Sequence, residues 1–200
     1  MSTIEDRLKD ISDIRSMMEQ SSKFLSLSGL SGISAGFVGI AAAAIAQYFI
    51  NTAGTESSGS NGVAFFLIGS VLTLIAALSL AAYFSVRMAR KKELPVWSAA
   101  TKLLLVNLFI PLAVGGLFCL ILLYHNISFL IAPSMLIFYG LALLNASKYT
   151  LKEIRYLGMS EICLGLFAST WIQFGIVLWG IGFGMLHIVY GTFMYFKYEK

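Results

Sequence analysis

The chain has 200 residues, of which 58% are hydrophobic and 12% are charged. Soluble globular domains carry about 25% charged residues, so this composition excludes an ordinary water-soluble domain. The 14 Lys and Arg residues against 10 Asp and Glu give a net charge of +4, but the charges stand in short clusters between long apolar segments. We therefore expect the basic balance to reflect membrane topology, and we expect no nucleic-acid partner.

Residues 1–24 precede the first apolar segment and are predicted to form an amphipathic helix. Apolar residues recur at three- and four-residue steps along one face, namely Ile4, Leu8, Ile11, Ile14 and Met18. Five acidic residues against four basic ones leave the segment slightly negative, which is unlike a helix that adheres to anionic lipid. Two interpretations stay open: a cytoplasmic helix for docking a partner or forming a homo-oligomer, or a surface helix packed on the protein itself or at the membrane interface.

Residues 25–200 contain the segments that can span a membrane. Crossing a hydrocarbon core of about 30 Å takes roughly 20 helical residues, and the backbone polar groups must be satisfied within each helix. Four apolar segments meet this length, at residues 27–50, 63–86, 101–124 and 127–146. The last stretch, 157–196, holds 40 residues, and a straight helix of that length would measure about 60 Å. It must turn back near Trp171–Gly175, which gives spans at 157–171 and 175–196.

The sequence thus predicts an all-α, polytopic integral membrane protein with one bundle of six transmembrane helices. With six spans, all 14 Lys and Arg residues fall on one side of the membrane. Because positive loops face the cytoplasm, we expect both termini to be cytoplasmic and the protein to reside in the cell (inner or plasma) membrane. A five-span layout would leave Lys197 and Lys200 outside.

Small residues at four-residue spacing predict close helix contacts. Gly32 and Gly36 form such a ladder in the first span, and Gly180 and Gly184 form another in the last. Helices in lipid associate largely through such close backbone contact, either within one chain or between subunits. Pro111 and Pro133 are predicted to kink the third and fourth spans, because each removes a helical hydrogen bond.

Polar side chains at membrane depth are costly, and they are the candidate site residues. Glu161 lies about 9 Å along the helix from the cytoplasmic end of its span, and counting outward from the turn near Gln173 places His187 at a similar level. Tyr190 follows on the same helical face as His187, and Asn107 lies at a comparable depth in the third span. Three interpretations of this cluster, in the inner half of the bundle, stay open: a proton relay, a polar lock between helices and, least favoured by the residue types present, a metal site.

We expect no metal, no cofactor and no catalytic residue. The chain has two histidines and two cysteines, without the spacing of a zinc site, and it lacks nucleophile-elbow, phosphate-loop and dinucleotide motifs. The leading hypothesis is a small non-enzymatic protein in contact with membrane lipid, either a transport or channel-like module or a membrane subunit. A transport module predicts a water-accessible cavity that reaches Glu161 and His187. The alternative is an intramembrane hydrolase or transferase that uses this pair on a lipid-like substrate.

Overall fold

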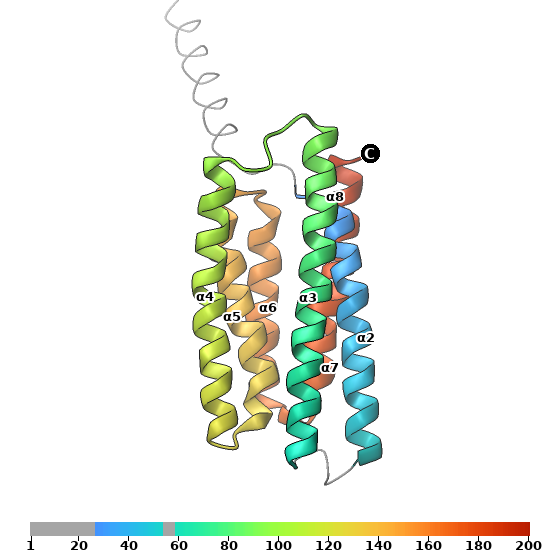
Figure 1. Ribbon diagram of the computed structural model, residues 1–200, viewed down its shortest axis with the longest axis vertical. Coiled ribbons are helices and arrows are strands. Elements are labelled where there is room, and N and C mark those ends of the chain that lie inside the picture. The colour runs from blue at the N-terminus through green and yellow to red at the C-terminus, as the bar shows by residue number, and fades with distance from the viewer. Residues whose placement is uncertain (1–26, 54–58) are drawn as a thin grey trace, which may run out of the picture.

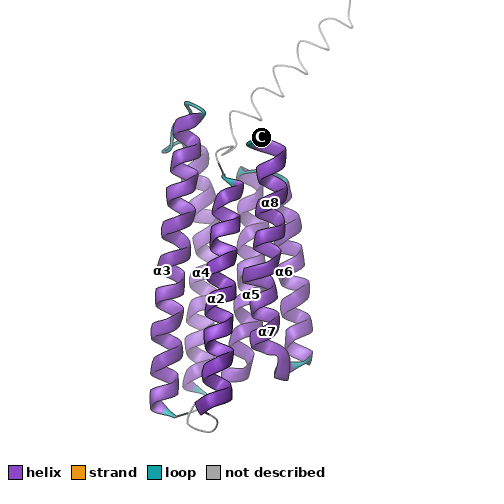
Figure 2. Cartoon of the chain, turned by 90° about the vertical axis from the view of Figure 1, so that its right-hand side faces the viewer, coloured by secondary structure: helices purple, strands orange, loops and turns teal. Residues whose placement is uncertain are grey.

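The computed structural model describes residues 27–53 and 59–200, and these residues form a bundle of helices that run along one common axis (Figures 1 and 2). The long helices are α2 (Gly29–Ala53), α3 (Ser60–Lys91), α4 (Ala99–Tyr124), α5 (Ile131–Ala146) and α6 (Glu153–Thr170). Three consecutive helical segments complete the chain: α7 (Gly175–Gly180), the π-helix η5 (Ile181–Leu186) and α8 (His187–Tyr198). Together they form one continuous helical rod, which we call the last rod. No strand occurs among the described residues, so the all-α prediction is confirmed for this part of the chain. The predicted amphipathic helix at residues 1–24 lies outside it.

Five helices are long and apolar enough to cross a membrane. They cover Gly29–Ala53, Asn61–Lys91, Ala99–Tyr124, Ser128–Tyr149 and Ile172–Tyr198. Large apolar side chains are exposed along α3 and α4, as expected of surfaces that face lipid rather than water. These five helices define an all-helical, membrane-embedded architecture. The segment predicted as the fifth span, 157–171, corresponds to α6, which has 18 residues and is not among the five.

The helices fall into two groups (Figure 1). In one group α2 packs on α3 and on the rod α7–η5–α8, and in the other α5 packs on α4 and α6. The groups meet where α7 and η5 contact α5 and α6. The chain passes from α6 to the rod through a 3₁₀ turn at Ile172–Phe174, within the region where the turn is expected.

Glycines bring the backbones of α2 and the last rod into direct contact. A Cβ atom added to Gly36 would lie 2.7 Å from the Gly184 carbonyl, and one added to Gly32 would lie 3.0 Å from the Gly191 Cα. A Cβ atom on Gly180 would lie 2.7 Å from the Ala43 side chain. The small residues of the two ladders are therefore used to pack α2 on the last rod within one chain.

The two prolines occupy different positions in their helices. Pro111 lies in the interior of α4, which continues through it. Pro133 is the third residue of α5, so it lies in the first turn, where a helical N–H has no partner within its own α-helix. Pro133 therefore shapes the beginning of α5 rather than kinking its middle.

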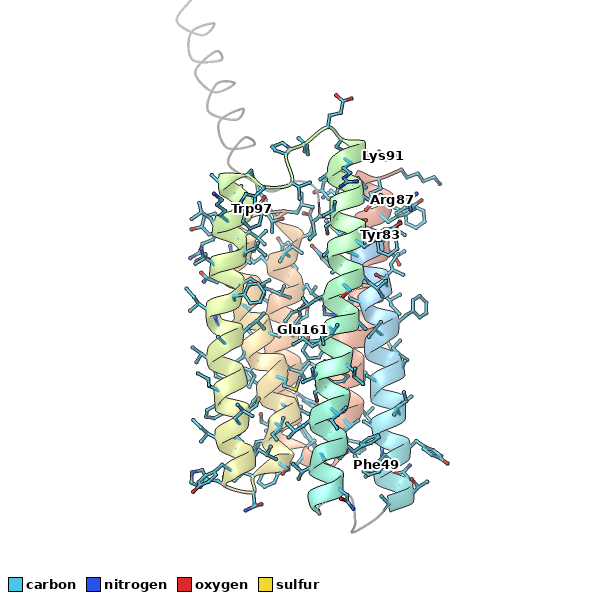
Figure 3. The ribbon with its side chains drawn as sticks, in the orientation of Figure 1. Phe49, Tyr83, Arg87, Lys91, Trp97 and Glu161 are labelled. Atoms are coloured by element: carbon cyan, nitrogen blue, oxygen red, sulfur yellow. The ribbon has the colours of Figure 1, made fainter. Side chains whose placement is uncertain are left out.

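One end of the bundle gathers the basic residues and a network around the C-terminus. All ten Lys and Arg residues in the described part of the chain stand at this end, where Figure 3 labels Arg87 and Lys91 on α3. Glu153, at the beginning of α6, accepts hydrogen bonds from Lys197 and from the Tyr198 hydroxyl, and Glu199 accepts one from the Gly29 backbone N–H. This network ties the ends of α2, α6 and α8 together.

Candidate intramembrane polar site

Glu161 and His187 lie buried where the two groups of helices meet. Glu161 belongs to α6 and is 0% exposed, and His187 is the first residue of α8 and is 6% exposed. Glu161 lies eight residues after Glu153, about 12 Å along the helix. Figure 3 shows it near mid-height of the bundle.

Both ring nitrogens of His187 are engaged. Nδ1 lies 2.9 Å from the Gly182 carbonyl oxygen, which can only accept, so Nδ1–H is the donor. Nε2 lies 2.7 Å from the Tyr139 hydroxyl. The neutral tautomer with its proton on Nδ1 satisfies both contacts, because Nε2 then accepts from Tyr139. The Gly182 carbonyl thus fixes the proton on Nδ1 and the orientation of the ring, and the Tyr139 hydroxyl occupies Nε2.

The Glu161 carboxyl group lies beside this histidine without a hydrogen bond. Its Oε1 is 3.5 Å from His187 Nδ1, whose proton points to Gly182, and neither carboxyl oxygen has a hydrogen-bond partner among the described residues. The fit is close, because a Cβ atom on Gly182 would lie 2.5 Å from Glu161 Oε2. A carboxylate buried in this way costs several kcal/mol unless it is neutralised or paired.

The segment that carries Gly182 is π-helical over Ile181–Leu186. Such wide turns are rare in proteins and are found frequently at functional sites. Here the π-helix precedes His187 directly, and its Gly182 carbonyl accepts from the His187 side chain rather than only from the backbone. The irregular turn and the polar site are therefore one structural unit.

A row of aromatic rings lies beside this unit. Trp179, Phe183 and His187 follow one another at four-residue spacing, with ring centroids 4.9 Å and 6.0 Å apart. Tyr139 contacts this row from α5, with its ring 4.8 Å from Phe183 and 5.4 Å from His187. The indole nitrogen of Trp179 is buried and has no hydrogen-bond partner among the described residues. We call Trp179, Phe183, His187 and Tyr139 the aromatic row.

The other two predicted members are placed differently. The Tyr190 hydroxyl is buried without a hydrogen-bond partner in the described part of the chain, one turn beyond His187. The Asn107 side chain donates to the Leu103 carbonyl on its own helix, and its backbone carbonyl accepts from Asn145. No hydrogen bond of the described residues connects Asn107 or Tyr190 to Glu161.

Sequence analysis did not identify Tyr139 or Gly182 as part of the site. A usable signal exists for Tyr139, because it lies in the middle of its span rather than at an interface, where tyrosines ordinarily anchor a membrane protein. No comparable signal exists for Gly182, whose role depends on the carboxyl group that packs against it. No set of three or more His, Cys, Asp or Glu side chains suited to a metal ion occurs among the described residues.

Comparison with protein-family models, with curated proteins and with solved structures gives no significant match for this chain. The geometry of the described residues therefore carries the functional argument.

Proposed function

We propose that the protein is a six-span membrane protein with both termini cytoplasmic, and that it is a non-enzymatic transport module with a proton-binding site at Glu161. The sixth crossing would be α6, whose length of about 27 Å approaches the thickness of the hydrocarbon core. Its composition is less apolar because of Glu153, Arg155 and Glu161. The first two lie at the basic end of the bundle, and the third is hidden from lipid.

The observation that carries the proposal is the state of the Glu161 carboxyl group. A residue that only locks two helices together would be expected to hydrogen-bond, because an unsatisfied buried polar group costs about 1–3 kcal/mol. Glu161 is fully buried and has no such bond among the described residues. Ionisable residues retained inside a membrane protein at this cost mark proton and ion pathways.

The water-accessible cavity predicted for a transport module does not reach Glu161, so this prediction is wrong for the structure described. With 0% of Glu161 and 6% of His187 exposed, water does not reach the carboxyl group. A transport module would need a second conformation in which water reaches Glu161, and such a conformation is part of the proposal. The same burial gives no support to the intramembrane hydrolase or transferase, because a lipid-like substrate would have to contact Glu161 directly.

Infrared difference spectroscopy on the protein in lipid nanodiscs tests the proposal. A buried protonated carboxyl group gives a C=O stretching band at high frequency, and we expect this band to disappear as the pH is raised. Glu161→Gln should abolish the pH-dependent band. The control Glu93→Gln, which changes an exposed loop residue, should leave it intact. A wild-type protein without this pH-dependent band, or a band retained in Glu161→Gln, would refute the proton site.

A further inference from the structure

Building on the proposed proton site, we infer that Glu161 exchanges its proton with the basic end of the bundle along the contact between α6 and α8, and that the Tyr190 hydroxyl relays the proton. This route deepens the proposed function, because it names the end of the molecule that reaches the site and a residue that controls access. Three observations support it: the groups that line the contact, the buried oxygen atoms left without partners there, and the different chemistry on the other side of Glu161.

The contact between α6 and α8 extends from the surface to the buried site. On α6, Glu153, Leu157 and Glu161 follow one another at four-residue spacing and lie along one face of the helix. At the basic end, Tyr198 of α8 donates a hydrogen bond to Glu153 Oε1 at 2.6 Å. At the site, His187 of α8 lies 3.5 Å from Glu161 Oε1. Side chains of the two helices therefore meet at both places, which are about 12 Å apart along α6.

Tyr190 occupies the interval between these two places. It follows His187 by about one helical turn and packs against an apolar cluster that includes Leu157 of α6. Its hydroxyl is buried and has no hydrogen-bond partner among the described residues. Glu153 interacts electrostatically with this hydroxyl. The phenol side chain therefore begins near the level of the site and reaches toward the basic end.

Glu153 forms the outer end of the route. Its Oε1 atom accepts hydrogen bonds from Lys197 and Tyr198, and the Lys197 side chain is 47% exposed. Its Oε2 atom is buried and has no hydrogen-bond partner in the described part of the chain. Two buried oxygen atoms without partners, Glu153 Oε2 and the Tyr190 hydroxyl, thus lie on the basic side of Glu161. Buried polar atoms of this kind bind ordered water, which carries protons between them.

The opposite side of Glu161 offers no comparable relay. There the site meets an apolar cluster that contains Leu136 and Leu178. The buried polar atom without a partner on that side is the indole nitrogen of Trp179. An indole N–H only donates a hydrogen bond, whereas a phenol hydroxyl both donates and accepts. A relay must accept one proton while it gives up another, so Tyr190 can serve as a relay and Trp179 cannot.

Proton transfer along this route is balanced. Glu153 takes up a proton from water at the basic end and passes it to the Tyr190 oxygen, while the original Tyr190 O–H bond breaks on the inner side. The released proton reaches the Glu161 carboxylate through water molecules that enter along the same contact, and a new O–H bond forms there. Each intermediate group gains one proton and loses one. Only Glu161 and the water at the basic end change their protonation, and proton release follows the route in reverse.

The rate at which Glu161 exchanges its proton for deuterium tests this route. The full-length protein in nanodiscs is transferred into D₂O below the pH at which the carboxyl band disappears, and the exchange is followed as that band moves to lower frequency. We expect Tyr190→Phe to slow the exchange by about tenfold or more, because a group that accepts and donates the proton is lost. The pH at which the band disappears should stay the same in this variant, since a relay changes the rate and not the equilibrium. Glu153→Gln should also slow the exchange, because an amide does not take up the proton.

Tyr156→Phe is the matched control and should exchange at the wild-type rate, because Tyr156 is 68% exposed on α6. A purely structural role of Tyr190 gives the opposite sign, since loosening the packed contact admits water and speeds the exchange. Exchange in Tyr190→Phe that is as fast as in the wild type, or faster, would overturn the inference. The Glu153→Gln rate, judged in the same way, is an independent measurement of the route. Failure of the proton site itself is distinct, because the wild type would then show no carboxyl band that responds to pH.

Discussion

At the scale of single residues, the two ring nitrogens of His187 form hydrogen bonds with groups on two different helical segments. Its Nδ1–H donates to the Gly182 carbonyl on its own rod, and its Nε2 accepts from Tyr139 on α5. In this arrangement the Nδ1 proton is directed at Gly182, so the ring makes no hydrogen bond to the Glu161 carboxyl group. Tyr139 is a positioning residue: its hydroxyl holds Nε2, while the Gly182 carbonyl holds the Nδ1 proton away from the carboxyl group.

Substitution of Tyr139→Phe should test this role. Without the hydroxyl donor, the buried Nε2 of His187 is unsatisfied, and we expect a loss of about 1–3 kcal/mol in the free energy of unfolding. ¹⁵N NMR of the imidazole should also show a shift of the Nε2 resonance, because the hydrogen bond to this nitrogen is lost. Tyr83→Phe is the matched control, because Tyr83 is exposed on α3. An unchanged stability and an unchanged Nε2 resonance in Tyr139→Phe would show that the hydrogen bond does not position His187.

At the scale of elements, the spans and the site differ in how far sequence could predict them. Hydropathy and length locate the apolar segments because lipid imposes a minimum helix length. Counting residues about the turn near Gln173 places Glu161 and His187 at one level, and the structure brings them to 3.5 Å. The partners of His187 could not be predicted in this way. In a helix that is apolar on all sides, periodicity does not reveal which face meets which neighbour, and Asn107 was therefore expected at the site where Tyr139 lies.

The contact between α2 and α8 gives a prediction at the same scale. A Cβ atom at Gly191 would lie 2.6 Å from both the Gly29 carbonyl oxygen and the Ile33 backbone nitrogen. Backbone atoms cannot move aside as a side chain can, so Gly191→Ala should lower the free energy of unfolding by about 1–3 kcal/mol. Thermal unfolding in mild detergent measures this. Gly116→Ala should cause no loss, because nothing lies within 4 Å of its added Cβ atom. Equal stability of the two variants would show that α2 and α8 are not closely packed.

At the scale of the whole molecule, the six-span layout makes a prediction about sidedness. Single cysteines at His125, Lys148 and Lys200, all exposed positions, can be introduced into a Cys119→Ala, Cys163→Ala background. A membrane-impermeant maleimide applied to intact cells should label the cysteine at 125 alone, and permeabilisation should add the other two. Labelling of positions 148 and 200 from opposite sides would establish an odd number of crossings between them and would remove α6 from the membrane.

Helix α3 is the longest of the described helices, with 32 residues, and its apolar stretch at 63–86 measures about 36 Å, more than a hydrocarbon core of about 30 Å. It packs mainly on α2, and its outward side chains are exposed along most of its length. A hydrophobic stretch longer than the hydrocarbon core tilts or locally thickens the surrounding lipid, at a cost of a fraction of a kcal/mol for each Å of mismatch. Bilayer thickness therefore acts on this molecule first through α3, and thicker membranes should favour an upright α3.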